Sequence, residues 1–268
     1  MDKLQDPDYL RKEQYQDPTR LRARINLHRD YSTSPENWFK WVFRRLELPD
    51  EARILELGCG PGDLWLENLT QLPSSWEITL TDFSEGMLQK SHSRLKDHRP
   101  RFRLAAADAR LIPFQEEVFN AVIANHMLYH IPDRSRGLQE IHRVLCPGGK
   151  LVAATIGNQH MQDLADLVAR FDPAGAGGFQ QARNPFTLEN GPDQLRPLFE
   201  NIQTFRQPDN LRVPKAEPLV KYVLSSFRLE VSESQRDEFQ DFLEQELEKN
   251  GGVITIRKDN GLLTAEKG

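Results

Sequence analysis

Cysteine is scarce in this chain of 268 residues. It has only two, Cys59 and Cys146, and both stand in glycine-containing turn sequences. Two cysteines cannot form the network of disulfides that organises many small secreted folds. We therefore expect both thiols to have a structural role, and a reducing cytoplasm to be the compartment.

Long apolar runs and an excess of positive charge are also absent. No run of about 18 apolar residues could span a bilayer, and the N-terminal sequence MDKLQDPDYLRKEQYQD lacks the apolar core of a secretory signal. Lysine and arginine total 35 against 40 acidic residues, a net charge of −5. Because nucleic acids and anionic membranes bind positive surfaces, we expect neither as a partner. A small-molecule substrate and a monomer or homodimer are expected instead.

Short apolar runs alternate with helical periodicity in the first half of the chain. Strands are expected at 53–58, 76–82, 102–108, 119–128 and 150–156. Helices are expected at 63–72, 84–95 and 134–145. This alternation predicts an α/β fold, with a doubly wound parallel sheet covered by helices on both faces. Such a sheet binds its ligand beyond the carboxyl ends of its strands.

The remaining segments predict additions to this sheet. Residues 1–50 have helical periodicity and no neighbouring strand, so they are expected to form a helical cap on the main domain, 51–268. A helical insertion is expected at 208–250, over the mouth of the pocket. Near the C-terminus, Asn260-Gly261 stands between two apolar runs and predicts a hairpin of two antiparallel strands.

A glycine-rich loop follows the first expected strand. The sequence ILELGCGPGDLW, 54–65, contains Gly58, Gly60 and Gly62 in the spacing G-x-G-x-G. This spacing is tighter than the dinucleotide fingerprint G-x-G-x-x-G. Asp63 follows at once, and a carboxylate at the start of a helix would repel a pyrophosphate. The loop is therefore predicted to hold a cationic or zwitterionic ligand, not a nicotinamide dinucleotide.

Five segments in order along the chain resemble one enzyme class. The ExGxGxG pattern that begins at Glu56 resembles motif I of class I S-adenosylmethionine-dependent methyltransferases. The later segments ITLTD, AAADARLIPF, FNAVIANHMLYHIPD and LCPGGKLVAAT are similar to further motifs of its ubiquinone/menaquinone methyltransferase-like group. The resemblance covers roughly 50–157. Its motifs follow strands and turns of the predicted sheet in the same order.

This resemblance implies a fold, a cofactor and a reaction. The fold would be a Rossmann-like, mostly parallel seven-stranded sheet with a C-terminal antiparallel hairpin. The cofactor would be S-adenosyl-L-methionine, converted to S-adenosyl-L-homocysteine, and the reaction methyl transfer to a small molecule. An S-adenosylmethionine-binding protein with a regulatory role, or with another reaction, remains the alternative.

The resemblance also implies which residues hold the nucleoside part of the cofactor. Asp82, at the end of a strand, would accept hydrogen bonds from the ribose hydroxyls. Asp108, beside Ala109, would meet the adenine amino group. Phe83 and Met87 would lie on the two faces of the adenine ring.

Other residues would hold the methionyl part. Gly58 and Gly60 would let the backbone approach it closely. Glu56 would order the loop or help to bind the ammonium group. The backbone carbonyl of Asn125, at the end of the fourth strand, is a second expected ammonium contact.

Two residues after the fourth strand are the candidates for catalysis. His126 and Tyr129 stand near the expected position of the methyl group, where either could contact the acceptor or act as a base. No second group of ligands with metal spacing accompanies them, so no metal is expected. From the cap, Tyr15, Tyr31 or Arg24 could reach the cofactor carboxylate or the acceptor.

Overall fold

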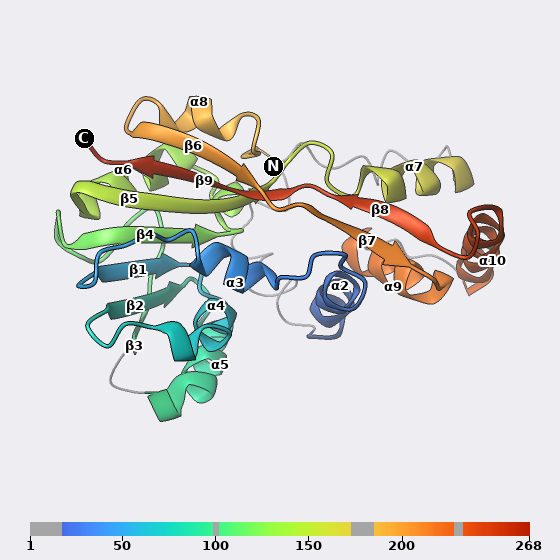
Figure 1. Cartoon of the computed structure of the whole chain (residues 1–268), viewed down its shortest axis with the longest axis horizontal. Helices are drawn as coiled ribbons and strands as arrows, with labels where there is room; N and C mark the ends of the chain where they lie inside the picture. Colours follow the sequence, from blue (N-terminus) through green and yellow to red (C-terminus); the bar gives the residue numbers. More distant parts are fainter. Residues whose placement is uncertain (1–17, 99–101, 173–184, 228–232) are drawn as a thin grey trace.

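A seven-stranded sheet forms the centre of the computed structural model, which describes residues 18–98, 102–172, 185–227 and 233–268 (Figure 1). The strand order is β3-β2-β1-β4-β5-β9-β6. Its strands are β1 (Arg53–Leu57), β2 (Glu77–Asp82), β3 (Phe102–Ala106), β4 (Phe119–Asn125), β5 (Leu145–Ile156), β6 (Glu200–Arg206) and β9 (Asn260–Glu266). The predicted doubly wound fold is confirmed.

The first five strands run parallel. β9 runs antiparallel to them, and β6, which is antiparallel to β9, runs in the same direction as the first five. β1 pairs with both β2 and β4, so the chain order reverses between β1 and β4. β9 lies antiparallel between β5 and β6. The carboxyl ends of β1, β2, β3 and β4 therefore share one edge, and the switch point at β1 and β4 is the expected place of a ligand.

Helices cover both faces of this sheet, because the buried strands are apolar on both sides. On one face, α4 (Asp63–Leu66) buries Leu64 and Trp65 against β1, β2 and β4. On the other, α6 (Arg134–Val144) buries Leu138 and Ile141. Further elements around the sheet are α5 (Glu85–Leu95), α8 (Gly191–Leu195) and the 3₁₀ turns Lys96–His98 and Leu128–His130.

The helix expected at 63–72 is shorter than predicted. α4 ends at Leu66, and a 3₁₀ turn, Leu69–Gln71, follows. The Asn68 side chain donates hydrogen bonds to the backbone oxygens of Leu64, at 2.7 Å, and Phe39, at 3.1 Å. A side chain that donates to a backbone oxygen of the preceding turn competes with the backbone hydrogen bonds of the helix, which explains the early end of α4.

The antiparallel part of the sheet is confirmed, but the turn predicted at Asn260-Gly261 is wrong. β8 (Ile254–Lys258) pairs with β7 (Asp209–Val213), and the chain then continues into β9 instead of turning back. A Cβ atom on Gly261 would lie 2.1 Å from the Phe205 backbone oxygen. The glycine therefore serves the close approach of two strands and not a hairpin turn.

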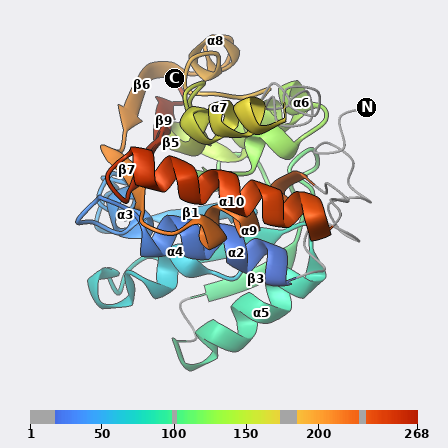
Figure 2. The same cartoon turned by 90° about the vertical axis from the view of Figure 1, so that its right-hand side faces the viewer.

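Beyond the main sheet, a second group of elements forms what we call the cap lobe (Figures 1 and 2). It consists of β7, β8, α2 (Pro18–Asp30), α7 (Gln162–Phe171), α9 (Ala216–Phe227) and α10 (Glu233–Lys249). Leu27, Leu164, Leu211, Leu219 and Ile256 belong to its apolar core. The insertion expected at 208–250 begins with the strand β7, not with a helix. No helix in the described part of the chain is long and apolar enough to cross a membrane.

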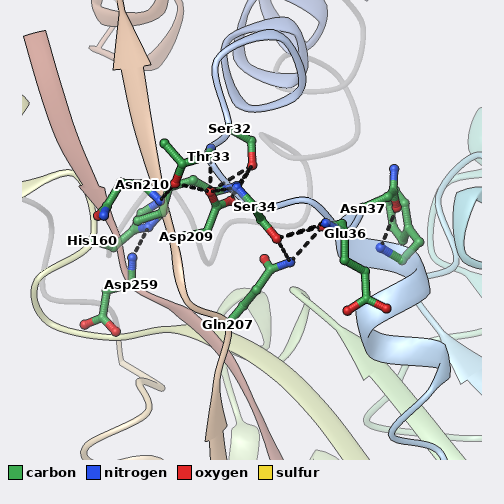
Figure 3. Close-up of polar contacts among 12 residues, drawn as sticks. Ser32, Thr33, Ser34, Glu36, Asn37, His160, Gln207, Asp209, Asn210 and Asp259 are labelled. Carbon is green, nitrogen blue, oxygen red and sulfur yellow. Dashed lines mark hydrogen bonds and ion pairs between the residues drawn. The ribbon is translucent and has the colours of Figure 1, made fainter.

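A buried carboxylate of β7 contacts the link that follows α2 (Figure 3). Asp209 accepts hydrogen bonds from Ser32 Oγ, from the backbone N–H groups of Thr33 and Ser34, both at 2.9 Å, and from Lys258. Burial raises the pKa of Asp209, but the hydrogen bonds from Lys258 and Ser32 outweigh it and lower the net value. This carboxylate therefore holds the link between α2 and α3 (Trp38–Phe43) in place.

Asp209→Ala should strongly destabilise the protein. The substitution leaves the buried Lys258 ammonium without its counter-ion, which typically costs about 3–5 kcal/mol. Urea unfolding at pH 7 measures the loss. Because the pKa of Asp209 is lowered by folding, its contribution is present above the unfolded value of about 3.9 and disappears as pH falls through the folded value.

The matched control is Asp193→Ala. Asp193 pairs with Arg196 on the surface, where both side chains are more than two-thirds exposed. Its removal should change the free energy of unfolding by at most about 1 kcal/mol. Equal losses in the two variants would contradict the central role of Asp209.

Candidate functional site

The glycine loop lies at the carboxyl edge of the sheet and borders open space. Gly58, Gly60 and Gly62 have φ angles of +67°, +54° and +81°, which residues other than glycine rarely adopt. A Cβ on Gly58 would lie 3.0 Å from the Met127 side chain, whereas nothing lies within 4 Å of a Cβ on Gly60. The backbone at Gly60 is therefore open to a ligand.

Glu56, in β1, is buried beneath this loop. Its carboxyl group accepts a hydrogen bond from Trp65 Nε1 at 2.6 Å. Burial raises the pKa of Glu56 to about 8, although the bond from Trp65 opposes the shift. The group is therefore largely protonated at neutral pH, and it joins β1 to α4. This position agrees with the loop-ordering role expected for Glu56; its contact with an ammonium group stays a prediction.

Asp82 connects the loops after two neighbouring strands. Its carboxylate accepts hydrogen bonds from the backbone N–H of Gly60, at 2.9 Å, and of Ser84, at 2.8 Å. Burial raises the pKa of Asp82, and these hydrogen bonds oppose the shift. Each carboxylate oxygen has two acceptor positions, so a diol can still bind. Phe83 beside it is 45% exposed, while Met87 is buried in the first turn of α5.

Asp108, after β3, faces an arginine in this structure. It forms a bidentate ion pair with Arg110, with 2.6 Å between Oδ2 and Nη2, and also accepts from the Arg110 backbone N–H. The hydrogen bonds from Arg110 lower the pKa of Asp108. Ala109, next to it, is buried. The adenine contact expected of Asp108 stays a prediction, and Arg110 is its partner here.

The loop after β4 brings the two catalytic candidates together with the cap. The rings of His126 and Tyr129 lie 6.4 Å apart, and the His126 ring lies 5.1 Å from that of Trp38. Trp38 Nε1 donates a 3.3 Å hydrogen bond to Asn125 Oδ1. Burial lowers the pKa of His126 to about 4, so its imidazole is neutral at pH 7 and can accept a proton. Trp38 thus lies beside Asn125 and His126, a long-range contact that the sequence did not indicate.

Two tyrosines of the cap were expected to reach the cofactor. Tyr15 lies outside the described residues. Tyr31 packs against the apolar core of the cap lobe, and its backbone oxygen accepts from Arg212 N–H at 2.9 Å. Its contact with the cofactor stays a prediction. Within the described ranges, no three histidine, cysteine, aspartate or glutamate side chains are grouped to hold a metal.

A group of rings that sequence reasoning missed lies in the cap lobe. The His28 ring stacks on His160 at 5.7 Å and meets Tyr222 edge-on at 5.7 Å. These residues come from α2, from the turn before α7 and from α9. They are far apart in the sequence, so no local motif could have revealed them.

Comparison with known proteins agrees with this geometry. Residues 54–149 match the family described as "Methyltransferase domain". The ubiquinone/menaquinone biosynthesis C-methyltransferase UbiE from Geobacter sp. (strain M21) is 32% identical over 132 residues, which are 48% of this chain and 56% of that protein. The chain spans about half the length of the curated relatives it matches.

Solved structures share the fold over nearly the whole chain. Phosphoethanolamine N-methyltransferase 2 from Haemonchus contortus, in complex with S-adenosyl-L-methionine, aligns with a TM-score of 0.60 at 18% identity, over 97% of this chain and 59% of that one. The 4+2 cyclase SpnF aligns with a TM-score of 0.55 at 15% identity, over 94% of this chain and 97% of that one.

The sheet order and the glycine loop at its switch point define a Rossmann-like methyltransferase fold. Residues 54–149, which contain this loop, match a methyltransferase domain and are similar to class I S-adenosylmethionine-dependent methyltransferases.

Glu56→Gln should change how the stability of the protein depends on pH. In the unfolded chain the Glu56 carboxyl loses its proton above about pH 4.3, whereas the folded chain keeps it up to about pH 8. The wild type should therefore lose up to about 1.4 kcal/mol of stability per pH unit in this interval, relative to the glutamine variant.

Urea unfolding of both proteins from pH 5 to pH 8 measures this difference. Glu85→Gln, on an exposed residue of α5, is the control and should follow the wild type. A constant difference between Glu56→Gln and wild type across the interval would show that Glu56 is ionised in the fold.

Proposed function

We propose that this protein transfers a methyl group from S-adenosyl-L-methionine to a small-molecule acceptor, by in-line displacement at the sulfonium. The observation that carries the proposal is the hydrogen bond from Gly60 N–H to Asp82, which joins the glycine loop to the end of β2 at the switch point of the sheet. The function class follows from the matched domain.

The residues at this edge fit the cofactor. Gly60 opens to free space, the Asp82 carboxylate has acceptor positions left for a ribose diol, and Phe83 presents an exposed ring beside it. At Gly58 the backbone could approach the methionyl part of the cofactor closely, and Met87 of α5 would contact the adenine ring. When bound, the cofactor supplies an electrophilic methyl group on a positively charged leaving group.

The chain's own task is to align the acceptor, exclude water and remove a proton where the acceptor carries one. His126 is the candidate base because burial keeps its imidazole neutral and Trp38 and Tyr129 lie beside it. Tyr129 is the second candidate and would orient the acceptor.

The acceptor is not inherited from the relatives. The matched domain ends at residue 149, before α7, β7, α9 and α10 of the cap lobe. The match therefore gives no information on these elements, and the quinone substrate in the name of the Geobacter protein is not transferred to this chain. We propose a small molecule in the cytoplasm as the acceptor, with the protein acting as a monomer or homodimer.

A second function is a cofactor-binding protein that carries out another reaction or regulates a partner. The similarity to the 4+2 cyclase SpnF favours it, because that protein has this fold and a name that describes no methyl transfer. The two functions share the cofactor-binding residues. They differ in whether the methyl group of S-adenosyl-L-methionine is transferred to an acceptor.

The deciding experiment incubates the protein with methyl-labelled S-adenosyl-L-methionine and a metabolite extract, and then separates the label by size. We expect label in a small molecule. Asp82→Asn should bind S-adenosyl-L-homocysteine at least about tenfold more weakly by calorimetry, because one charged acceptor is lost. Glu85→Gln, three residues away and exposed, should bind like the wild type.

Label in protein or RNA would overturn the acceptor class. Tight binding of S-adenosyl-L-homocysteine without any transfer would support the second function. Undiminished binding by Asp82→Asn would remove Asp82 from the cofactor site.

His126→Asn should lower turnover by about 10²–10⁴-fold if His126 is the base, with little change in the affinity for S-adenosyl-L-homocysteine. Because the pKa of His126 is about 4, wild-type turnover should be flat from pH 6 to pH 8 and fall as the pH approaches 4. The control is His142→Asn, on α6, where the His142 ring packs against Phe199 away from the β4 edge. Unchanged turnover in His126→Asn would exclude this residue as the base.

A further inference from the structure

Two buried nitrogen atoms on α2 have no hydrogen-bond partner in the described part of the chain. They are Arg24 Nε and His28 Nδ1. The residues are four positions apart in one helix, so their side chains lie on the same face, one turn apart. Buried polar atoms in native folds are almost always satisfied, and each exception needs an explanation such as a ligand.

The His28 ring is held from two sides. His160 stacks on it, and Tyr222 meets it edge-on. His160 Nδ1 accepts a 3.3 Å hydrogen bond from the Asp259 backbone N–H, so the proton of its neutral ring is on Nε2. The His28 ring is therefore fixed in place, and its unpartnered Nδ1 has a defined orientation.

The cations around this face differ in whether a carboxylate pairs with them. Lys258 is neutralised by Asp209, and Arg170 by Glu246. For Arg24, by contrast, Nε has no hydrogen-bond partner among the described residues. Burial lowers the pKa of His28 to about 3, and the positive charges of Lys258 and Arg24 contribute to the shift, against Asp209. A guanidinium whose buried N–H lacks an acceptor is a suitable donor to an anionic oxygen.

This face lies beside the proposed site of methyl transfer. The backbone N–H of His126, after β4, donates a 3.1 Å hydrogen bond to the backbone oxygen of Ala154 in the neighbouring strand β5. His160 stands shortly after the end of β5 at Ile156. His126 and His160 therefore follow neighbouring parallel strands at the same carboxyl edge of the sheet.

We propose that Arg24 and His28 bind an anionic oxygen of the methyl acceptor, so that the acceptor is a small organic anion. Arg24 Nε–H and the Nδ1–H tautomer of His28 donate the two hydrogen bonds, and the rings of His126 and Trp38 face the remainder of the molecule. The proposal rests on the proposed function, since this face belongs to an acceptor site only if the cofactor lies at the β4 edge.

Calorimetry on the protein saturated with S-adenosyl-L-homocysteine tests it with matched probes. Benzoate and phenyl phosphate are the anions, and benzamide is the neutral counterpart of benzoate. We expect at least one anion to bind at least about tenfold more tightly than benzamide, because its hydrogen bonds are charge-assisted. Arg24→Gln should abolish this preference, and His28→Phe, which keeps a ring in place, should weaken it.

The control is Arg29→Gln, which removes one positive charge from the exposed side of the same helix, where Arg29 pairs with Asp30. It should keep the anion preference, and thermal unfolding verifies that each variant is folded. Equal binding of anions and benzamide, or an undiminished preference in Arg24→Gln, would overturn the proposal.

One further arm separates the acceptor from the cofactor's own carboxylate. If Arg24 held that carboxylate, Arg24→Gln would weaken binding of S-adenosyl-L-homocysteine but not of methylthioadenosine, which lacks the amino-acid part. That result would overturn the assignment to the acceptor while leaving the proposed function intact. Failure of the wild type to bind S-adenosyl-L-homocysteine at all would instead refute the proposed function.

Discussion

The arrangement of this molecule depends on one buried carboxylate. Asp209 stands at the start of β7, where the chain leaves the main sheet, and its charge is balanced by Lys258 of the adjacent strand. An ion pair in a low-dielectric interior is stable only when its remaining polar positions are also satisfied. The segment that satisfies them, 32–34, comes from the link between α2 and α3.

The consequence is that the N-terminal helices are fixed relative to both sheets. Once the link is bound to Asp209, α2 packs on the cap lobe, and α3 reaches the main sheet, where Trp41 and Val42 are buried. Trp38 then lies at the end of β4, against Asn125 and His126. A polar contact in the C-terminal half of the chain thus determines the aromatic surroundings of a residue at the carboxyl edge of the sheet.

The sequence predicted best those features that depend on neighbouring residues. The helix expected at 84–95 is present as α5, and the Ser84 side chain accepts from Met87 N–H at its start. The glycines at 58, 60 and 62 have the positive φ angles that their spacing required. Asp82 lies at a strand end, beside the loop to which the motif order assigned it.

Features that depend on contacts between residues far apart in the sequence could not be predicted from local motifs. Asn260-Gly261 has the composition of a hairpin turn, yet Gly261 is there because the Phe205 backbone lies against it. Arg110 follows Asp108 closely, but the ion pair between them depends on the shape of the loop after β3. His28, His160 and Tyr222 belong to three elements that only the packing of the cap lobe brings together.

This difference has a physical basis and a functional one. The cofactor edge is built from short loops that directly follow strands, so each motif carries its own geometry, and the edge can be recognised at low identity. The proposed acceptor side involves the cap lobe, whose elements lie outside the matched domain and meet through long-range packing. A fold made in this way can keep one cofactor while its acceptor changes, because substitutions in α2, α7 or α9 leave the loops after β1 and β2 untouched.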